Sequence, residues 1–253
     1  MEINKVYCKD NLEVLKSLPD GVVDLIYCDI LYGTGRNFGD YQDLKSDRRV
    51  IEEHYIPRIQ EMHRVLKDTG SIYLQCDYRI NHWIRCIMDD IFGYGNFRNE
   101  IIWCYKNGGA SKSNFSNKHD NIYWYSKSKN YKYNLIKEKS YLAHRYGFKG
   151  IEEFKDEDGW YTMVNPKDYW NINPVTKDGN EKTGYSTQKP KALLERIIKA
   201  SSNEGDLVAD FYCGSGTSLV VAKESGRNYI GCDINQRAVD ITEERLKKII
   251  LDK

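Results

Sequence analysis

The sequence predicts an α/β fold in which a doubly wound, mostly parallel sheet carries a small inserted lobe. Three observations support this fold class. Short apolar runs typical of buried strands alternate with segments whose apolar residues repeat at helical intervals. Several runs end in an acidic residue followed by a loop, and the alternation loosens once, between about residues 127 and 184. A chain of 253 residues can bury one large core, so we expect one domain with an insertion.

The elements before residue 127 follow a repeated strand and helix order. The turn Pro19-Asp20-Gly21 separates a helical pattern from an apolar run that ends at Asp29. Lys67 to Gly70 is a helix-stop signal ahead of the next strand. The predicted elements are, in order, a strand at 6–8, a helix at 11–18, a strand ending at 29, a helix at 50–66, a strand at 71–75 and a helix from 81.

The pattern from 127 to 184 mixes polar and aromatic residues without a long amphipathic stretch, which predicts an irregular inserted lobe. Regular order returns after Lys189-Pro190. A stripe at Leu193, Leu194, Ile197 and Ile198 predicts a helix. A strand at 206–210, a glycine loop, a helix through 219–222 and a strand at 228–233 complete the chain.

Two loops far apart in sequence carry the chemistry. Asp29-Ile30-Leu31-Tyr32 follows one buried strand, and the segment from Asp210 to Thr217 follows another. Ligands of doubly wound sheets bind outside the carboxyl ends of the strands, so we expect the two loops to meet across one crevice. One would hold a cofactor and the other a substrate amine.

The glycine loop predicts a nucleoside site. Gly214 and Gly216 would let a ligand approach the main chain, and Asp233, which ends the next strand, would accept from ribose hydroxyls. Leu219 stands where a dinucleotide fingerprint needs its third glycine, and no Walker lysine follows. The alternative is a tight turn between strand and helix with no ligand.

Composition excludes several classes of protein. No stretch is long enough to span a bilayer, and the first residues lack the basic leader and apolar core of a secretory signal, so we expect a cytoplasmic protein. Seven scattered cysteines lack the close paired spacing of zinc sites, which predicts no metal.

Charge is unevenly distributed. Between Cys104 and Gly150 ten Lys or Arg stand against two acids, among many aromatic residues. Cations interleaved with rings suit a phosphate backbone and unstacked bases. A solvated lysine face over core aromatics is the alternative.

Five segments in order resemble the amino-methylating DNA methyltransferases of the permuted β class, which use S-adenosylmethionine. They are Tyr7 to Leu12, Asp29 to Tyr32, Thr187 to Pro190, Asp210 to Thr217, and Gly231 to Asp233. The resemblance implies a methyltransferase sheet with a catalytic half at 1–126, a target-recognition insert at 127–184 and a cofactor-binding half at 185–253. It implies methyl transfer to an adenine amine in a short duplex sequence, because cytosine-amine members more often have Ser at the position of Asp29.

The resemblance also assigns roles. Asp29 and the carbonyl of Ile30 would accept the two amine hydrogens, and Tyr32 would stack on the flipped base. Cofactor contacts would come from Asp10, Thr187, Lys189, Asp210, Phe211, Gly214, Ser215, Gly216, Thr217 and Asp233.

The sequence departs from the family where Ile30 and Leu31 replace two prolines and Phe211 replaces a third. Proline fixes φ, so the catalytic loop is expected to be less rigid before substrate arrives. Three alternatives therefore stay open: methylation of cytosine's amine or of RNA, a weak or inactive DNA-binding homologue, and a Rossmann-like enzyme of another kind. Methylation at the cytosine ring carbon is not expected, since no Pro-Cys pair is present.

The predicted partner is double-stranded DNA. Contacts are expected from Arg36 in a glycine-rich loop and from Lys106, Lys112, Lys118 and His119, the last as a positioning residue. The small insert would suit a short target and a homodimer, and the family leaves room for a companion restriction endonuclease.

Overall fold

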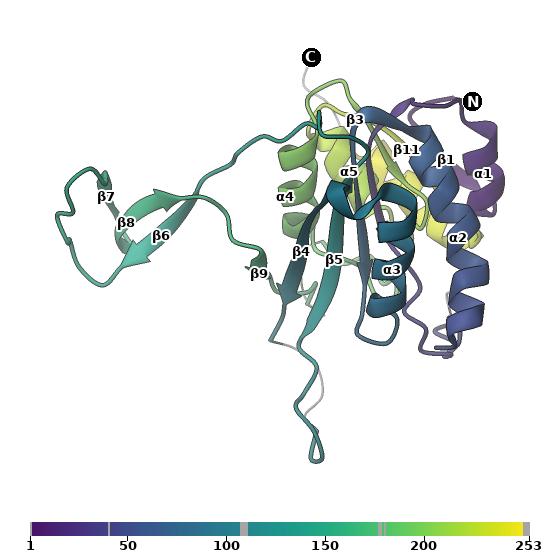
Figure 1. Ribbon diagram of the computed structural model, residues 1–253, viewed down its shortest axis with the longest axis horizontal. Helices are drawn as coiled ribbons and strands as arrows, with labels where there is room; N and C mark the ends of the chain where they lie inside the picture. The colour runs from purple at the N-terminus through teal and green to yellow at the C-terminus, as the bar shows by residue number, and fades with distance from the viewer. Residues whose placement is uncertain (1, 40, 107–110, 177–178, 180, 250–253) are drawn as a thin grey trace.

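The computed structural model describes residues 2–39, 41–106, 111–176, 179 and 181–249 (Figure 1). Its main feature is an eight-stranded sheet in the order β1-β11-β10-β2-β3-β5-β4-β9. β5 runs against both of its neighbours, whereas the other pairs are parallel. The strands are β1 (Lys5–Cys8), β2 (Val23–Asp29), β3 (Leu66–Cys76), β4 (Phe97–Cys104), β5 (His119–Ser126), β9 (Tyr169–Asn171), β10 (Leu207–Asp210) and β11 (Asn228–Asp233).

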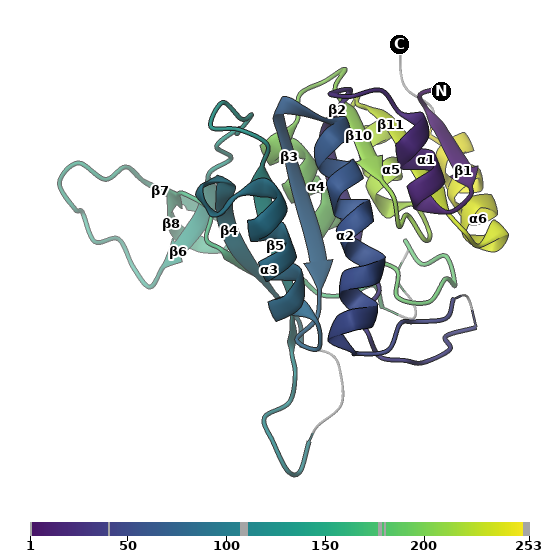
Figure 2. The ribbon, with the colours of Figure 1, turned by 45° about the vertical axis from the view of Figure 1, so that its right-hand side comes forward.

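Helices cover both faces of this sheet, which confirms the doubly wound α/β prediction. α1 (Asn11–Ser17), α2 (Arg48–Val65) and α3 (Asn81–Phe92) bury their apolar residues in one core cluster. α4 (Lys191–Ser201), α5 (Thr217–Glu224) and α6 (Gln236–Lys247) do so in a second cluster on the other face. Figure 2 shows α2 and α3 in front of the sheet and α4 and α5 behind it. None of the described helices is long and apolar enough to cross a membrane.

The position of β10 brings the two ends of the sequence together. β10 lies between β11 and β2, and Ala209 pairs with Ile26 in parallel register. The carboxyl ends of β2 and β10 therefore meet at one edge of the sheet, as the sequence predicts for Asp29 and Asp210. This is the topological switch point at which ligands of such sheets bind.

The insert is more regular than expected. β6 (Glu138–Leu142), β8 (Gly159–Val164) and β7 (Glu153–Asp156) form an antiparallel sheet that projects away from the main sheet in Figure 1. The prediction of an irregular lobe is wrong here, because strands of four to six residues with half-exposed faces leave little periodic signal. β9 lies within 127–184 but pairs with β4 in the main sheet.

Two further differences concern the main sheet. Lys67 to Gly70 is extended rather than a turn, because β3 starts at Leu66 and pairs there with Val23. β4 and β5 were not identified as strands from the sequence. Their chain connection, of which residues 107–110 lie outside the described residues, leaves the same edge of the sheet as the loop after β2.

Candidate active site

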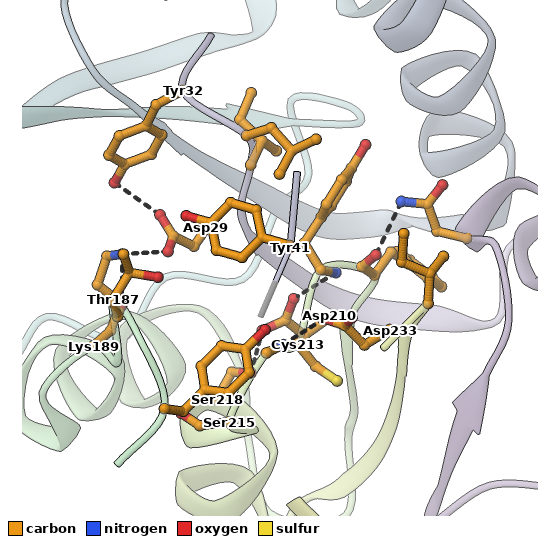
Figure 3. Close-up of a pocket in the computed structure, with 18 of the residues that line it drawn as sticks. Asp29, Tyr32, Tyr41, Thr187, Lys189, Asp210, Cys213, Ser215, Ser218 and Asp233 are labelled. Atoms are coloured by element: carbon orange, nitrogen blue, oxygen red, sulfur yellow. Dashed lines mark hydrogen bonds and ion pairs between the residues drawn. The ribbon is translucent and has the colours of Figure 1, made fainter. Parts of the chain in front are cut away.

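A cavity opens at the carboxyl edge of β1, β11, β10 and β2, and two acids from the sequence prediction face it. Asp29 ends β2 and Asp210 ends β10 (Figure 3). The lining includes every predicted catalytic residue and all predicted cofactor residues except Gly216: Asp10, Asp29, Ile30, Tyr32, Thr187, Lys189, Asp210, Phe211, Gly214, Ser215, Thr217 and Asp233.

The Asp29 carboxylate is held from two sides. Its Oδ2 forms an ion pair with Lys189 Nζ, and its Oδ1 accepts from the Tyr32 hydroxyl at 2.8 Å. Figure 3 shows Asp29 between these two side chains. Burial raises the pKa of the Asp29 carboxyl, and the Lys189 ammonium offsets part of that rise. Asp29 is thus an acceptor whose two oxygens already have partners.

A polar network lies behind Tyr32. The Tyr32 hydroxyl is 2.7 Å from Asp120 Oδ2, and Gln75 Nε2 donates to both of them at 3.0 Å. Gln75 Oε1 accepts from the Tyr27 hydroxyl at 2.7 Å. Gln75 and Asp120 are buried, so these bonds satisfy groups that would otherwise be costly to remove from water.

The loop without prolines has other anchors. The Ile30 N–H donates to the Gln75 carbonyl at 3.1 Å, a bond that proline could not form. The Leu31 carbonyl accepts from the Tyr55 hydroxyl at 3.0 Å. The Phe211 N–H likewise donates to Cys28 Sγ at 3.4 Å. Hydrogen bonds therefore constrain the positions at which the family has proline, contrary to the expectation of a less restrained loop.

Lys189 reaches the site from a strained turn. Thr187 has a left-handed backbone with φ 61°, and its carbonyl accepts from Lys189 Nζ at 3.2 Å. Such a conformation costs roughly 1 to 3 kcal/mol in a residue other than glycine and is common at functional sites. The Gln188 amide fixes the turn by donating to the Glu181 carbonyl at 2.6 Å.

Asp210 is a buried acid. Burial raises its pKa to about 7, although the Ser218 hydroxyl and the Tyr212 N–H, the latter at 3.0 Å, both donate to its carboxylate. In Figure 3 the Asp210 and Ser218 side chains face one another. The carboxyl group therefore titrates near neutral pH.

The two loop glycines have different roles. Gly214 has φ 49° and lines the cavity, and a Cβ there would lie 3.1 Å from the Tyr185 ring. Gly216 does not line the cavity, which corrects its assignment as a residue approached by a ligand. A Cβ on Gly216 would lie 2.2 Å from the Thr242 side chain, so Gly216 allows α5 to pack closely against α6.

The loop after Tyr32 is ordered by one carboxylate. Asp43 is buried and accepts from the N–H groups of Gly33, Thr34 and Leu44 at 2.8 to 3.1 Å. Isolated bridges join residues 34 and 45 and residues 37 and 42. The glycine-rich segment is therefore a folded loop that lines part of the cavity.

The predicted DNA contacts lie outside the cavity. Arg36, Lys106, Lys112 and His119 are exposed, and Lys118 is partly exposed. Arg36 belongs to the loop after β2, and the others belong to the β4–β5 connection or to the start of β5. Both segments leave the carboxyl edge of the sheet, so the predicted contacts surround the cavity mouth on the catalytic side.

Sequence reasoning missed several residues at the site. Arg58 on α2 lines the cavity and pairs with Asp10 at 2.8 Å. His54, one helical turn earlier, is 3.1 Å from the Tyr212 hydroxyl, and burial lowers its pKa to about 4. A polar residue within a buried strand, such as Gln75, was the available signal for the network behind Tyr32.

Comparison with known proteins identifies the family. A family model described as a DNA methylase, labelled N6_N4_Mtase, matches residues 23–244. This chain belongs to that family of amino-methylating DNA methylases. Its cofactor is therefore S-adenosylmethionine.

Curated relatives of this methylase match over nearly its full length. The type II methyltransferase M.HpaI of Haemophilus parainfluenzae is 31% identical over 96% of this chain and 74% of its own length. The DNA adenine methyltransferase YhdJ of Escherichia coli (strain K12) is 33% identical over 94% of this chain and 80% of its own.

Solved structures share the fold. The PvuII DNA methyltransferase, described as cytosine-N4-specific, has a TM-score of 0.71 at 16% identity and covers 99% of this methylase and 89% of that chain. The M1.HpyAVI complex with S-adenosylmethionine has a TM-score of 0.61 at 22% identity and covers 95% and 98%.

The side chains that line the cavity fit such a cofactor. Asp10 and Asp233 follow or end neighbouring strands, since Cys8 pairs with Asp233 between β1 and β11. Carboxylates are suitable acceptors for the hydroxyl and amine donors of a nucleoside. In this structure Asp233 Oδ2 accepts from the Gly214 N–H at 3.0 Å, and Asp10 caps α1 through the Leu12 N–H at 2.8 Å.

Proposed function

We propose that this methylase transfers the methyl group of S-adenosylmethionine to the exocyclic amine of adenine in a short duplex sequence. The observation that carries the proposal is the meeting of Asp29 and Asp210 at one cavity. One loop can then hold the amine while the other binds the methyl donor. Bound S-adenosylmethionine would supply an electrophilic methyl group on a positively charged sulfur.

Asp29 and the Ile30 carbonyl make the amine reactive. The lone pair of an exocyclic amine is delocalised into the ring, which makes the nitrogen a poor nucleophile. Two acceptors on its hydrogens favour a pyramidal nitrogen whose lone pair can attack in line. The Asp29 carboxylate is one acceptor. Ile30 supplies the other, and its N–H is already fixed on Gln75.

Tyr32 would stack on a base that has left the duplex. Flipping costs a few kcal/mol, and stacking on an aromatic ring offsets part of that cost. The Tyr32 ring lies at the cavity, with Lys189 Nζ 5.5 Å from its centroid.

Cofactor contacts are proposed at the other loops. Asp233 would accept from ribose hydroxyls, and Asp10 from the adenine of the cofactor. Thr187 and Lys189 would flank its methionine end. The segment from Asp210 to Thr217 would line the cofactor between them, except for Gly216, whose position is explained by packing.

Adenine is favoured over cytosine by Asp29 and by the name of one relative. YhdJ is described as a DNA adenine methyltransferase, whereas the PvuII enzyme, which shares the fold, is described as cytosine-N4-specific. Methylation of the cytosine N4 amine is therefore the second candidate, with the same residues in the same roles.

Double-stranded DNA is the proposed partner, bound through Arg36 and the basic β4–β5 connection. Sequence choice would come from the inserted sheet of β6, β7 and β8. A homodimer would enlarge the small contact area, and a companion endonuclease would fit the type II relatives.

The test is expression in a host that lacks its own DNA methylases, followed by mass spectrometry of the nucleosides. We expect N6-methyladenine with the wild-type chain and none with Asp29→Ala. N4-methylcytosine would support the second candidate. Unmodified DNA, with both cofactor and DNA bound in vitro, would instead indicate an inactive homologue.

A further inference from the structure

Tyr32 faces two carboxylates with one proton. Its hydroxyl oxygen lies 2.8 Å from Asp29 Oδ1 and 2.7 Å from Asp120 Oδ2. A tyrosine hydroxyl can donate one hydrogen bond. Gln75 Nε2 donates to Tyr32 and to Asp120, and its item-by-item contacts do not include Asp29. The two carboxylates therefore compete for one donor.

The competition matters for the amine. Asp29 Oδ2 is in the ion pair with Lys189, so Oδ1 is the oxygen that a substrate amine could reach without breaking that pair. When Tyr32 donates to Asp29, it occupies this oxygen. When Tyr32 donates to Asp120, Oδ1 becomes available. Burial and the two carboxylates raise the pKa of Tyr32, so the hydroxyl keeps its proton in either arrangement.

We propose that Asp120 is a positioning residue for methyl transfer: it draws the Tyr32 hydroxyl away from Asp29, so that Asp29 Oδ1 can accept a hydrogen of the substrate amine. This inference rests on the proposed function. No covalent step is assigned to Asp120, which acts through Tyr32.

The surroundings of Asp120 suit a fixed acceptor. Its side chain is 5% exposed, and its Oδ1 accepts from the Tyr105 hydroxyl at 3.1 Å. Its Oδ2 accepts from Gln75, which Tyr27 holds in turn. Asp120 is thus oriented by side chains from β2, from β3 and from the residue after β4, and it does not depend on the substrate for its position.

Asp120→Asn is the informative change. An amide oxygen is a weaker acceptor than a carboxylate, so the Tyr32 proton should move to Asp29. The hydroxyl then competes with the amine. A hydrogen bond to a charged group is worth roughly 1.5 to 3 kcal/mol, so we expect the single-turnover rate of methyl transfer to fall by about tenfold or more.

Removing the Tyr32 hydroxyl should cancel this loss. Tyr32→Phe keeps a ring for stacking and leaves Asp29 Oδ1 without a competitor. We expect Tyr32→Phe alone to retain a rate within about threefold of wild type. We expect the double variant Asp120→Asn/Tyr32→Phe to be faster than Asp120→Asn and to match Tyr32→Phe.

Tyr73→Phe is the matched control. It removes another buried tyrosine hydroxyl of the same sheet, which is 2.7 Å from Ser201 Oγ and outside the cavity. Combined with Asp120→Asn, it should restore nothing. Binding of S-adenosylhomocysteine and thermal unfolding of every variant show whether each one is folded.

The pH profile gives a second measurement. The Asp120 charge raises the pKa of Asp29, so Asp120→Asn should move the acidic limb of the rate profile to lower pH. A role in stability alone would leave that limb in place.

The results separate the two proposals. An active wild type whose double variant is no faster than Asp120→Asn would overturn the role of Asp120 and leave the proposed function standing. A loss of more than tenfold in Tyr32→Phe alone would also overturn that role, because the hydroxyl would then be needed rather than competing. An inactive wild type would overturn both.

Discussion

Replacing Asp210 with Asn is expected to stabilise the protein at pH 8 in the absence of cofactor. Burial raises the pKa of Asp210 from an ordinary 3.8 to about 7. Between these values the folded state keeps a proton that the unfolded state has lost, so stability falls as pH rises from about 4 to 7. The destabilisation is complete above pH 7 and absent below about pH 4.

The magnitude follows from the two pKa values. A difference of about three pH units corresponds to about 4 kcal/mol, at 1.36 kcal/mol per unit. An amide removes this effect and can keep the local bonds, since its oxygen can accept from the Tyr212 N–H and its nitrogen can donate to Ser218. Asp210→Asn should therefore gain up to about 4 kcal/mol at pH 8 and almost nothing at pH 4.

Urea unfolding at pH 4, 6 and 8 measures this difference. Asp206→Asn is the matched control at the other end of the same strand segment, because Asp206 pairs with Lys132 Nζ at 2.7 Å. That variant should lose stability at pH 8. An Asp210→Asn variant that is less stable than wild type at pH 8, or that differs from it equally at all three pH values, would refute the reasoning.

Two further predictions concern packing and DNA binding. Gly216→Ala should lower the free energy of unfolding by about 2 to 4 kcal/mol, since its Cβ would overlap Thr242 at a φ of 71°, whereas Gly39→Ala, at φ 82° with open space, should cost about 1 kcal/mol; similar losses in denaturant titrations would contradict the packing role. Arg36→Ala and Lys112→Ala should each weaken DNA binding at low salt and reduce the slope of log K against log salt by about 1, as fluorescence anisotropy would measure; unchanged slopes would remove their phosphate contacts.

The sequence predicted the elements that carry the site. Apolar runs ending at Asp29 and Asp210, each followed by a loop, located both half-sites, and the rules for doubly wound sheets placed them at one edge. The structure confirms that arrangement through the pairing of β10 with β2. The alternation of strands and helices was equally readable because each buried run is continuous and each helix has an apolar stripe.

Other features depend on tertiary contacts that no local pattern contains. Asp120 and Gln75 lie on different strands and meet Tyr32 only after the sheet has formed. Gly216 appeared to be a ligand-binding glycine, but its neighbour is a side chain of α6. The missing prolines suggested a loose loop, because the bonds from Ile30 to Gln75 and from Leu31 to Tyr55 become visible only in three dimensions.

The most direct test is a structure of this methylase with S-adenosylhomocysteine and a duplex that contains its target sequence. We predict the cofactor product along the loops after β1, β10 and β11, and a flipped adenine on Tyr32 with its amine between Asp29 and the Ile30 carbonyl. A base bound away from Asp29, or a cofactor product outside the cavity shared with Asp210, would contradict the account.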